Sequence, residues 1–331
     1  MKILNSYING NHRVIIYDNG TKIKETGFYN TDGKWVETDD DHFTYDFPEN
    51  FDIKITDQCD GGCIYCHENS TVNGKHGDLK ALEGTINSLH AGTECAIGGG
   101  NALAHPDLVW FLERLKKQGV IANITINQRH LKPYKDLICK IVAEKLVNGI
   151  GVSLTDSSNE DDFKFIDTLG NNVVIHTIAG ILSEKDIPAI TARKVLILGY
   201  KDLRRGHALL EKKGDDITSK IEWLKEKLPE LRKICKLISF DCLGIEQIDP
   251  KNVLKITDEE YNTLFQGADT DVYDADGNIT CCTMYIDVPN MEVARCSTQV
   301  FEEREPFTGD ENIRSLFKKS CKYANPKCFT L

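Results

Sequence analysis

Three cysteines crowd into one short stretch, DQCDGGCIYCHENS, which covers residues 57–70. Cys59, Cys63 and Cys66 have two glycines and an aromatic residue between them, and His67 follows. Three thiolates from one loop can hold three corners of an iron–sulfur cube, which leaves the fourth iron open for a substrate or cofactor. A zinc site completed by His67 and a set of buried structural thiols are the alternative interpretations.

A second group of cysteines lies near the C-terminus. It comprises Cys281, Cys282, Cys296, Cys321 and Cys328. The N-terminal residues contain no long apolar segment typical of a signal peptide, so we expect a cytoplasmic protein. In a reducing cytoplasm, 12 cysteines indicate metal ligation or redox chemistry rather than disulfides.

Four further cysteines lie in apolar strand or helix contexts. They are Cys95, Cys139, Cys235 and Cys242. Because a free cysteine in such a context usually packs as a small apolar side chain, we expect these four to be buried.

Composition and charge narrow the function classes. The chain has 331 residues, of which 40% are hydrophobic and 27% charged, as in a globular protein with a sizeable core. The net charge of −11 and the lack of a run of Lys and Arg disfavour binding to extended nucleic acid, although a local basic pocket remains compatible. No apolar run approaches the length of a membrane span.

The cysteine loop must be positioned by the elements around it. Residues 1–50 read as a β-rich extension, with strand patterns around turn signals such as Asp32-Gly33. Residues 51–249 alternate strand and helix patterns, which predicts a partial or full α/β barrel, or alternatively a doubly wound open sheet. The seven candidate strands are 51–56, 94–99, 121–127, 149–154, 172–180, 194–200 and 236–241. The cysteine loop follows the first strand, at the barrel end where chemistry is located.

Residues 250–331 form the third predicted part. A turn at Asp276-Gly277, strands in TMYIDV and EVARC, and a helix in ENIRSLFKKSC predict a small α+β appendage that carries cysteines. Such a segment is too small to bury much core by itself.

The spacing Cys-x3-Cys-x2-Cys, with Tyr65 before the last cysteine and a strand before the first, resembles the radical S-adenosylmethionine (SAM) superfamily. The resemblance covers roughly residues 51–241. It implies a partial or full TIM-type barrel, a [4Fe-4S] cluster held by the catalytic Cys59, Cys63 and Cys66, and SAM bound at the open iron. Tyr65 would lie against the adenine of SAM or shield the cluster.

Downstream segments resemble the superfamily in the same order along the chain. The resemblance implies cofactor contacts by Gly99, Gly100, Asn101, Thr125, Asn127, Ser153, Ile178 and Gly180. Asn101 stands where the family often has Glu, and an amide oxygen still accepts a hydrogen bond from an ammonium group but without a full charge. Gln128 and His176 replace glycines of the family pattern.

The C-terminal cysteines resemble a SPASM or shorter twitch domain. Nine residues separate Cys281 from Met291 and four separate Met291 from Cys296, with Met where the family has Gly. The resemblance implies that Cys281, Cys296, Cys321 and Cys328 hold one auxiliary iron–sulfur cluster. Zinc binding, unligated thiols and a cluster with an open site are the alternatives.

The resemblance implies an enzyme that cleaves SAM reductively and abstracts a hydrogen atom from a substrate, with a peptide or protein favoured. A nucleotide or small metabolite is the alternative substrate, and a non-catalytic zinc-binding module is the alternative of a different class. A flavodoxin or ferredoxin would supply electrons. Asp241, Arg204 and Arg205 are candidates for lining the substrate cavity.

Overall fold

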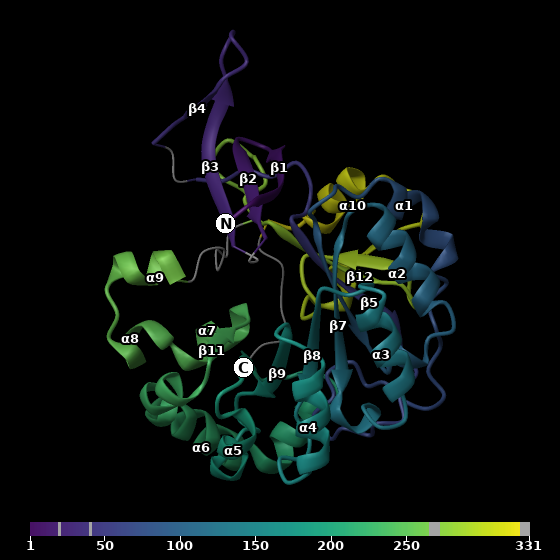
Figure 1. The fold of residues 1–331 in the computed structure, drawn as a ribbon, viewed down its shortest axis with the longest axis vertical. Helices are drawn as coiled ribbons and strands as arrows, with labels where there is room; N and C mark the ends of the chain where they lie inside the picture. The colour runs from purple at the N-terminus through teal and green to yellow at the C-terminus, as the bar shows by residue number, and fades with distance from the viewer. Residues whose placement is uncertain (19–20, 40–41, 265–271, 325–331) are drawn as a thin grey trace.

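The computed structural model describes residues 1–18, 21–39, 42–264 and 272–324. The N-terminal residues form a four-stranded antiparallel sheet, which confirms the predicted β-rich extension. Figure 1 shows this sheet at one end of the molecule. Its strands are β1 (Ile3–Asn9), β2 (His12–Tyr17), β3 (Lys22–Tyr29) and β4 (Trp35–Glu37).

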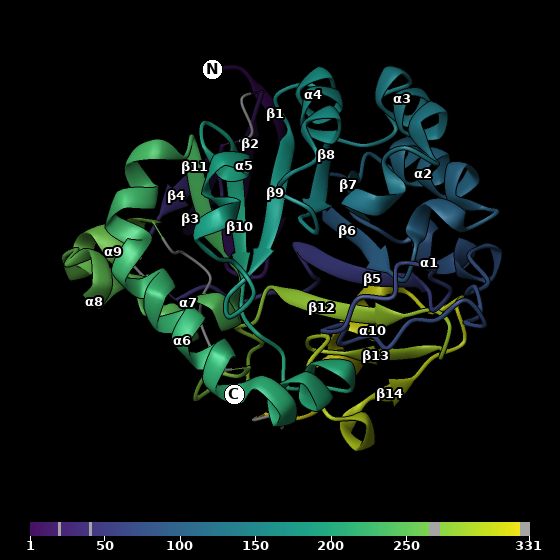
Figure 2. The same ribbon diagram turned by 90° about the horizontal axis from the view of Figure 1, so that it is seen from below.

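Seven parallel strands build the main sheet, and all seven were predicted. They are β5 (Asn50–Thr56), β6 (Glu94–Gly99), β7 (Ile121–Asn127), β8 (Gly149–Ser153), β9 (Val173–Ile178), β10 (Lys194–Leu198) and β11 (Leu237–Phe240). Each strand is hydrogen-bonded to its neighbour in sequence, so the order never reverses as it does in a doubly wound sheet. Figure 2 shows the strands on an arc that is open between β11 and β12 (Thr283–Asp287), so the fold is a partial barrel.

Helices cover the outer face of the arc (Figure 2). They are α1 (Glu83–Asn87), α2 (Leu108–Lys117), α3 (Lys135–Ala143), α4 (Glu160–Thr168), α5 (Ile187–Ile190) and α6 (Arg205–Ile234), with 3-10 turns η1 (Lys80–Leu82), η2 (Ala102–Ala104), η3 (Gln128–His130) and η4 (Glu184–Asp186). In β7, Ala122, Ile124 and Ile126 are buried, whereas the alternate residues face the inside of the arc and are only half-buried. This alternation leaves the inner face available for polar side chains.

The longest described helix is α6, which begins at Arg205. Lys213 has φ −138° and ψ 29°, so two helical segments meet at a kink there. None of the described helices combines the length and the apolar character that a membrane span requires.

The C-terminal segment joins the main sheet. Strand β12 pairs in parallel with β5, and β13 (Glu292–Ala294) and β14 (Glu305–Pro306) continue outward as antiparallel strands. The remaining elements are α7 (Cys242–Ile248), α8 (Pro250–Leu254), α9 (Asp258–Leu264), η5 (Phe301–Glu303) and α10 (Ile313–Ser320). Ile286 and Phe317 belong to the same apolar core as Ile53 of β5. A segment too small for its own core is therefore stabilised by sharing that of the barrel. The division at residues 50 and 249 stays a prediction.

A buried ion pair connects the N-terminal sheet to the start of β5. His12 Nε2 lies 2.7 Å from Glu49 Oε1, and the two side chains are 0% and 1% exposed. Lys24 Nζ lies 2.9 Å from the other carboxylate oxygen. Burial by itself would raise the pKa of Glu49, but the hydrogen bond from His12 and the charge of Lys24 outweigh it and hold this pKa at about 2.

Acid should weaken this connection. Because the folded pKa of Glu49 lies below its ordinary value of 4.5, its stabilisation is complete above pH 4.5 and is lost as pH falls toward 2. The full contribution is about 3 kcal/mol. Urea unfolding at pH 7, 4 and 3 should show Glu49→Gln less stable than the native protein at pH 7, with the gap closing in acid. A gap that does not change with pH would contradict this account.

Candidate functional site

The cysteine loop lies at the carboxyl end of β5 and packs on the glycine segment that follows β6. The backbone N–H groups of Gly100 and Asn101 each donate a 2.7 Å hydrogen bond, to the carbonyls of Thr56 and Gln58 respectively. A Cβ on Gly100 would lie 2.2 Å from the Gln58 carbonyl oxygen, so only glycine permits this approach. The glycines expected to contact SAM thus also seat the cysteine loop.

Gly61 lies beside two of the three thiols of the loop. A Cβ built on Gly61 would lie 3.3 Å from Cys59 Sγ and 3.9 Å from Cys63 Sγ, so a side chain there would crowd both sulfurs. Burial raises the pKa of Cys59 and Cys63, and the charge of Cys66 adds to the rise in both. All three residues are half-buried. Three partly accessible thiols on one loop fit an iron–sulfur cube.

The arrangement differs from a zinc site. Tetrahedral zinc with sulfur ligands needs sulfurs about 3.8 Å apart. Among the residues that the structure describes, the one group of three possible ligands within 4.8 Å is Cys59, Asp60 and His130. His67 Nε2 instead lies 3.2 Å from Glu68 Oε1. The three thiols and His67 are therefore not preassembled around a single ion.

Residues at the end of β7 and directly after it contact the cysteine loop. Two of them, Arg129 and His130, were not predicted from the sequence. The guanidinium of Arg129 donates to the Gly61 carbonyl, and His130 Nε2 lies 2.8 Å from Asp60 Oδ1. Asn127 Nδ2 donates to Cys63 Sγ at 3.5 Å. The available signal was the polar triplet Gln128-Arg129-His130, which directly follows an apolar strand.

Tyr65 also contacts a thiol of the cysteine loop. Burial and the neighbouring Cys63, through its charge and a hydrogen bond, raise the pKa of Tyr65 to about 12, so the phenol keeps its proton. A neutral phenol beside Cys63 is compatible with the predicted shielding role.

The other predicted cofactor residues line the same edge of the sheet. Asn127 of β7 pairs with Ser153 of β8, and Thr125 lies two residues earlier on the same face. Ile178 ends β9, and Gly180 follows with φ +79°. A Cβ on Gly180 would lie 2.7 Å from Ile217 of α6, so this glycine serves helix packing. Contacts of these residues with SAM stay predictions.

The three residues expected to line a substrate cavity have structural partners. Asp241 Oδ1 accepts hydrogen bonds from the backbone of Gly199 at 2.8 Å and of Gly244 at 2.7 Å, so it caps α7. Arg204 and Arg205 donate to the carbonyls of Glu68 and Ser70. The two arginines thus anchor the segment after Cys66.

The C-terminal thiols gather around Arg295. Its Nε lies 3.4 Å from Cys281 Sγ, and its charge also acts on Cys321 and Cys242. Burial, followed by the charge of Cys281, raises the pKa of Cys321 to about 12. Cys296 is half-buried and lies among the charged neighbours of Cys242. Cys328, the fourth predicted ligand, lies outside the described residues.

The expectation for the four cysteines in apolar contexts is only partly correct. Cys95 is buried and Cys235 is half-buried, but Cys139 and Cys242 are exposed. Cys242 begins α7, which buries the next two residues against β10 and so turns the cysteine away from the core. Periodicity in a helix this short could not predict that orientation.

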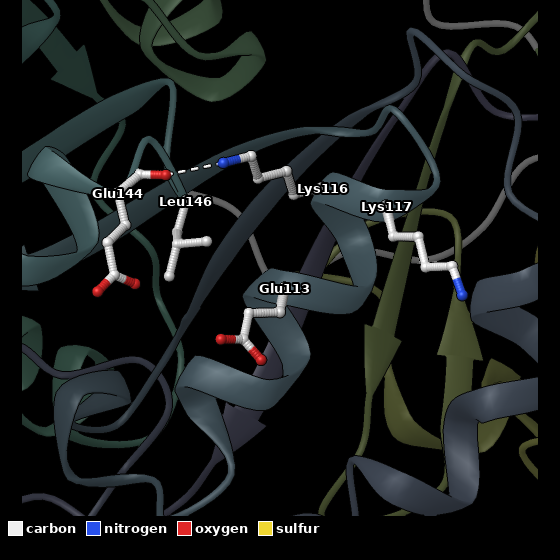
Figure 3. Close-up of a pocket in the computed structure, with 5 residues that line it drawn as sticks. All are labelled: Glu113, Lys116, Lys117, Glu144 and Leu146. Carbon is white, nitrogen blue, oxygen red and sulfur yellow. Dashed lines mark hydrogen bonds between the residues drawn. The ribbon is translucent and has the colours of Figure 1, made fainter.

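A surface hollow lies away from these residues. Figure 3 shows its lining residues on α2 and on the turn after α3. They are Glu113, Lys116, Lys117, Glu144 and Leu146. Lys116 Nζ donates to the Glu144 carbonyl at 2.8 Å. None of the predicted site residues lines this hollow, so we assign no chemistry to it.

The contacts around Gly61 predict that adding one methyl group at this position lowers the iron content. Gly61→Ala should reduce iron content after anaerobic reconstitution, because its Cβ would crowd Cys59 Sγ. Gly62→Ala is the matched control: Gly62 has φ +61° and no atom within 4 Å of a built Cβ, so alanine should cost about 1 kcal/mol of stability but no iron. Equal iron in both variants would contradict the proposed role of Gly61.

Comparison with known protein families finds a match that includes the cysteine loop. Residues 53–205 match the model of the radical SAM superfamily. No curated protein matches the chain by sequence.

Two solved structures of Streptococcus suis SuiB resemble most of the fold. SuiB bound to its precursor peptide SuiA aligns with a TM-score of 0.54 at 14% identity, covering 83% of this chain and 65% of SuiB. SuiB bound to S-adenosylmethionine aligns with the same score and identity, over 83% and 66%. This chain therefore spans slightly less than two thirds of SuiB, and at this identity the similarity shows the fold alone.

Proposed function

Because residues 53–205 form a domain of the radical SAM superfamily, we propose that the protein cleaves SAM reductively at a [4Fe-4S] cluster held by Cys59, Cys63 and Cys66. The observation that carries this proposal is the loop of three half-buried thiols inside the matched stretch, with Gly61 leaving space beside two of them. Three cysteine ligands leave one iron for SAM.

A bound cluster and SAM would supply the chemistry, which is one-electron cleavage of a carbon–sulfur bond of the sulfonium and hydrogen abstraction from the substrate. The protein would position the cluster and SAM and shield them from water. Asn127 and Tyr65 orient the Cys63 thiol, and Arg129 fixes the backbone at Gly61. The strand-end residues Thr125 and Ser153 are placed to bind SAM, and the arc of strands limits access of water.

The substrate that we propose is a peptide or protein. The support is the SuiB structure with its bound precursor peptide, together with the open side of the barrel between β11 and β12. A nucleotide or small metabolite is the alternative. Electrons would come from a small redox protein such as a flavodoxin or ferredoxin.

The substrate class can be tested with deuterated pools. The reconstituted protein is incubated with SAM, dithionite and either uniformly deuterated peptides or uniformly deuterated nucleosides. Hydrogen abstraction transfers deuterium into 5′-deoxyadenosine, and we expect this transfer from the peptides. Transfer from the nucleosides alone would overturn the peptide assignment. If the purified protein contains zinc instead of iron, the alternative of a non-catalytic zinc-binding module would be favoured.

We further propose an auxiliary iron–sulfur cluster at the C-terminal thiols. Cys281, Cys296 and Cys321 are its described candidate ligands, and Cys328 is the fourth predicted one. Arg295 supports the proposal, because a guanidinium 3.4 Å from Cys281 Sγ stabilises thiolates. Cys282 is the spare member of the adjacent pair, since Lys24 and Glu49 near the N-terminal sheet are among its charged neighbours.

A further inference from the structure

Lys54 is a charged residue in the middle of the first barrel strand, and its side chain is only 2% exposed. Its ammonium lies 2.7 Å from Asp57 Oδ1, 3.0 Å from Glu68 Oε2 and 3.1 Å from Asp287 Oδ2. A Cβ on Gly99 would lie 3.0 Å from Lys54 Cγ, so this glycine leaves room for the lysine side chain. A buried cation with three carboxylate partners is rare and needs an explanation.

Two arginines balance the remaining negative charge. Arg204 Nη1 lies 3.6 Å from Glu68 Oε2, and Arg304 Nη1 lies 3.6 Å from Asp287 Oδ2. We call the six residues Lys54, Asp57, Glu68, Arg204, Asp287 and Arg304 the loop network. It holds three carboxylates and three cations, so its formal charge is zero.

The charged states follow from the surroundings. Burial alone would lower the pKa of Lys54, but Glu68 and Asp287 outweigh it and raise this pKa above its usual range.

The loop network connects both ends of the cysteine loop to the ammonium of Lys54. Asp57 precedes Cys59 by two residues, and Glu68 follows Cys66 by two. Asp287 belongs to β12, so Lys54 also ties the loop to the C-terminal segment. From there Arg304 donates to the Ser297 carbonyl at 2.8 Å, directly after Cys296. One buried charge network thus reaches the vicinity of both groups of thiols.

We propose that the loop network positions the cysteine loop and sets the reduction potential of the cluster by keeping the local charge at zero. The proposal rests on the proposed function, since it presupposes a cluster at Cys59, Cys63 and Cys66. A charge fixed in a buried region acts strongly on an added electron, because little water screens it. Extra negative charge should make the cluster harder to reduce, and extra positive charge easier.

The test is an anaerobic redox titration of the reconstituted protein without SAM, followed by electron paramagnetic resonance. Lys54→Met leaves the loop network at −1 and should lower the midpoint potential. Glu68→Gln leaves it at +1 and should raise the potential. The double variant is neutral again, and its potential should return toward that of the native protein. Opposite shifts that cancel are the signature of charge, because damage to the loop would not reverse sign.

Two control variants separate the effect of the charge of Lys54 from the effect of changing its side chain. Lys54→Arg keeps the charge and should keep the potential near the native value. Lys80→Met removes a lysine from an exposed pair with Asp107 and should shift nothing. If Lys54→Met does not fold, Glu68→Gln and the double variant still decide between charge and structure.

The outcomes distinguish the two proposals. Shifts of the same sign in both single variants, or no shift with full iron content, would overturn the role of the loop network and leave the proposed function intact. A native protein that binds no cluster would overturn the proposed function itself.

Discussion

Replacement of Cys59, Cys63 and Cys66 by alanine should abolish SAM cleavage, and each single replacement should do the same. A cube held by three thiolates loses a corner with each substitution, and His67, which follows Cys66, is paired with Glu68. The measurement is the amount of 5′-deoxyadenosine formed from SAM and dithionite after anaerobic reconstitution. We expect none above the level without protein.

The control for this result is another cysteine of the same domain. Cys139 of α3 is exposed and lies outside the loop, so Cys139→Ala should keep full cleavage. Circular dichroism should show the native helix and strand content in every variant, because the three loop thiols are not part of the apolar core. Cleavage by the triple variant would refute the role of the three cysteines as ligands.

Replacement of Cys296 or Cys281 by alanine should remove about half of the iron and leave SAM cleavage in place. Two cubes correspond to about eight irons per chain and one cube to about four. Cys281 precedes β12, whose first residue pairs with the start of β5, whereas the cysteine loop follows the end of β5, so loss of one cluster should spare the other. Iron and zinc are measured together by elemental analysis on each variant.

Cys282→Ala is the matched control for the C-terminal site. Cys282 is next to Cys281 in the sequence, but the charged neighbours of Cys282 include Lys24 and Glu49 rather than Arg295. We expect its iron content to equal that of the native protein. A native content near four irons, or zinc at the C-terminal thiols, would contradict the auxiliary cluster.

The sequence was sufficient to predict the barrel and the cysteine loop. Period-two burial in strands such as β7, and apolar residues of α2 at helical spacing, are local patterns that survive into the structure. The consecutive strand order follows from short right-handed crossovers. The loop was recognisable because Cys59, Cys63 and Cys66 combine a specific spacing with a position after a strand.

The partners of the loop could not be predicted in the same way. Lys54 and Asp287 lie 233 residues apart, and only the parallel pairing of β5 with β12 brings them together. That pairing leaves no local pattern in either segment. Lys54 itself was a usable signal, because a lysine in an apolar strand must find a buried partner. Arg204 and Arg205 were expected at a cavity, and their actual role as donors to loop carbonyls depends on the path of the backbone.

The most direct test of the account is whether SAM binds an iron that no protein side chain occupies. The reduced cluster is studied by electron–nuclear double resonance with SAM labelled with 17O at the carboxylate and 15N at the amine. We predict hyperfine coupling of both labels to the cluster, which requires direct ligation to one iron. A [4Fe-4S] cluster that shows no coupling to either label, or an oxygen-free protein that holds no such cluster, would contradict the account.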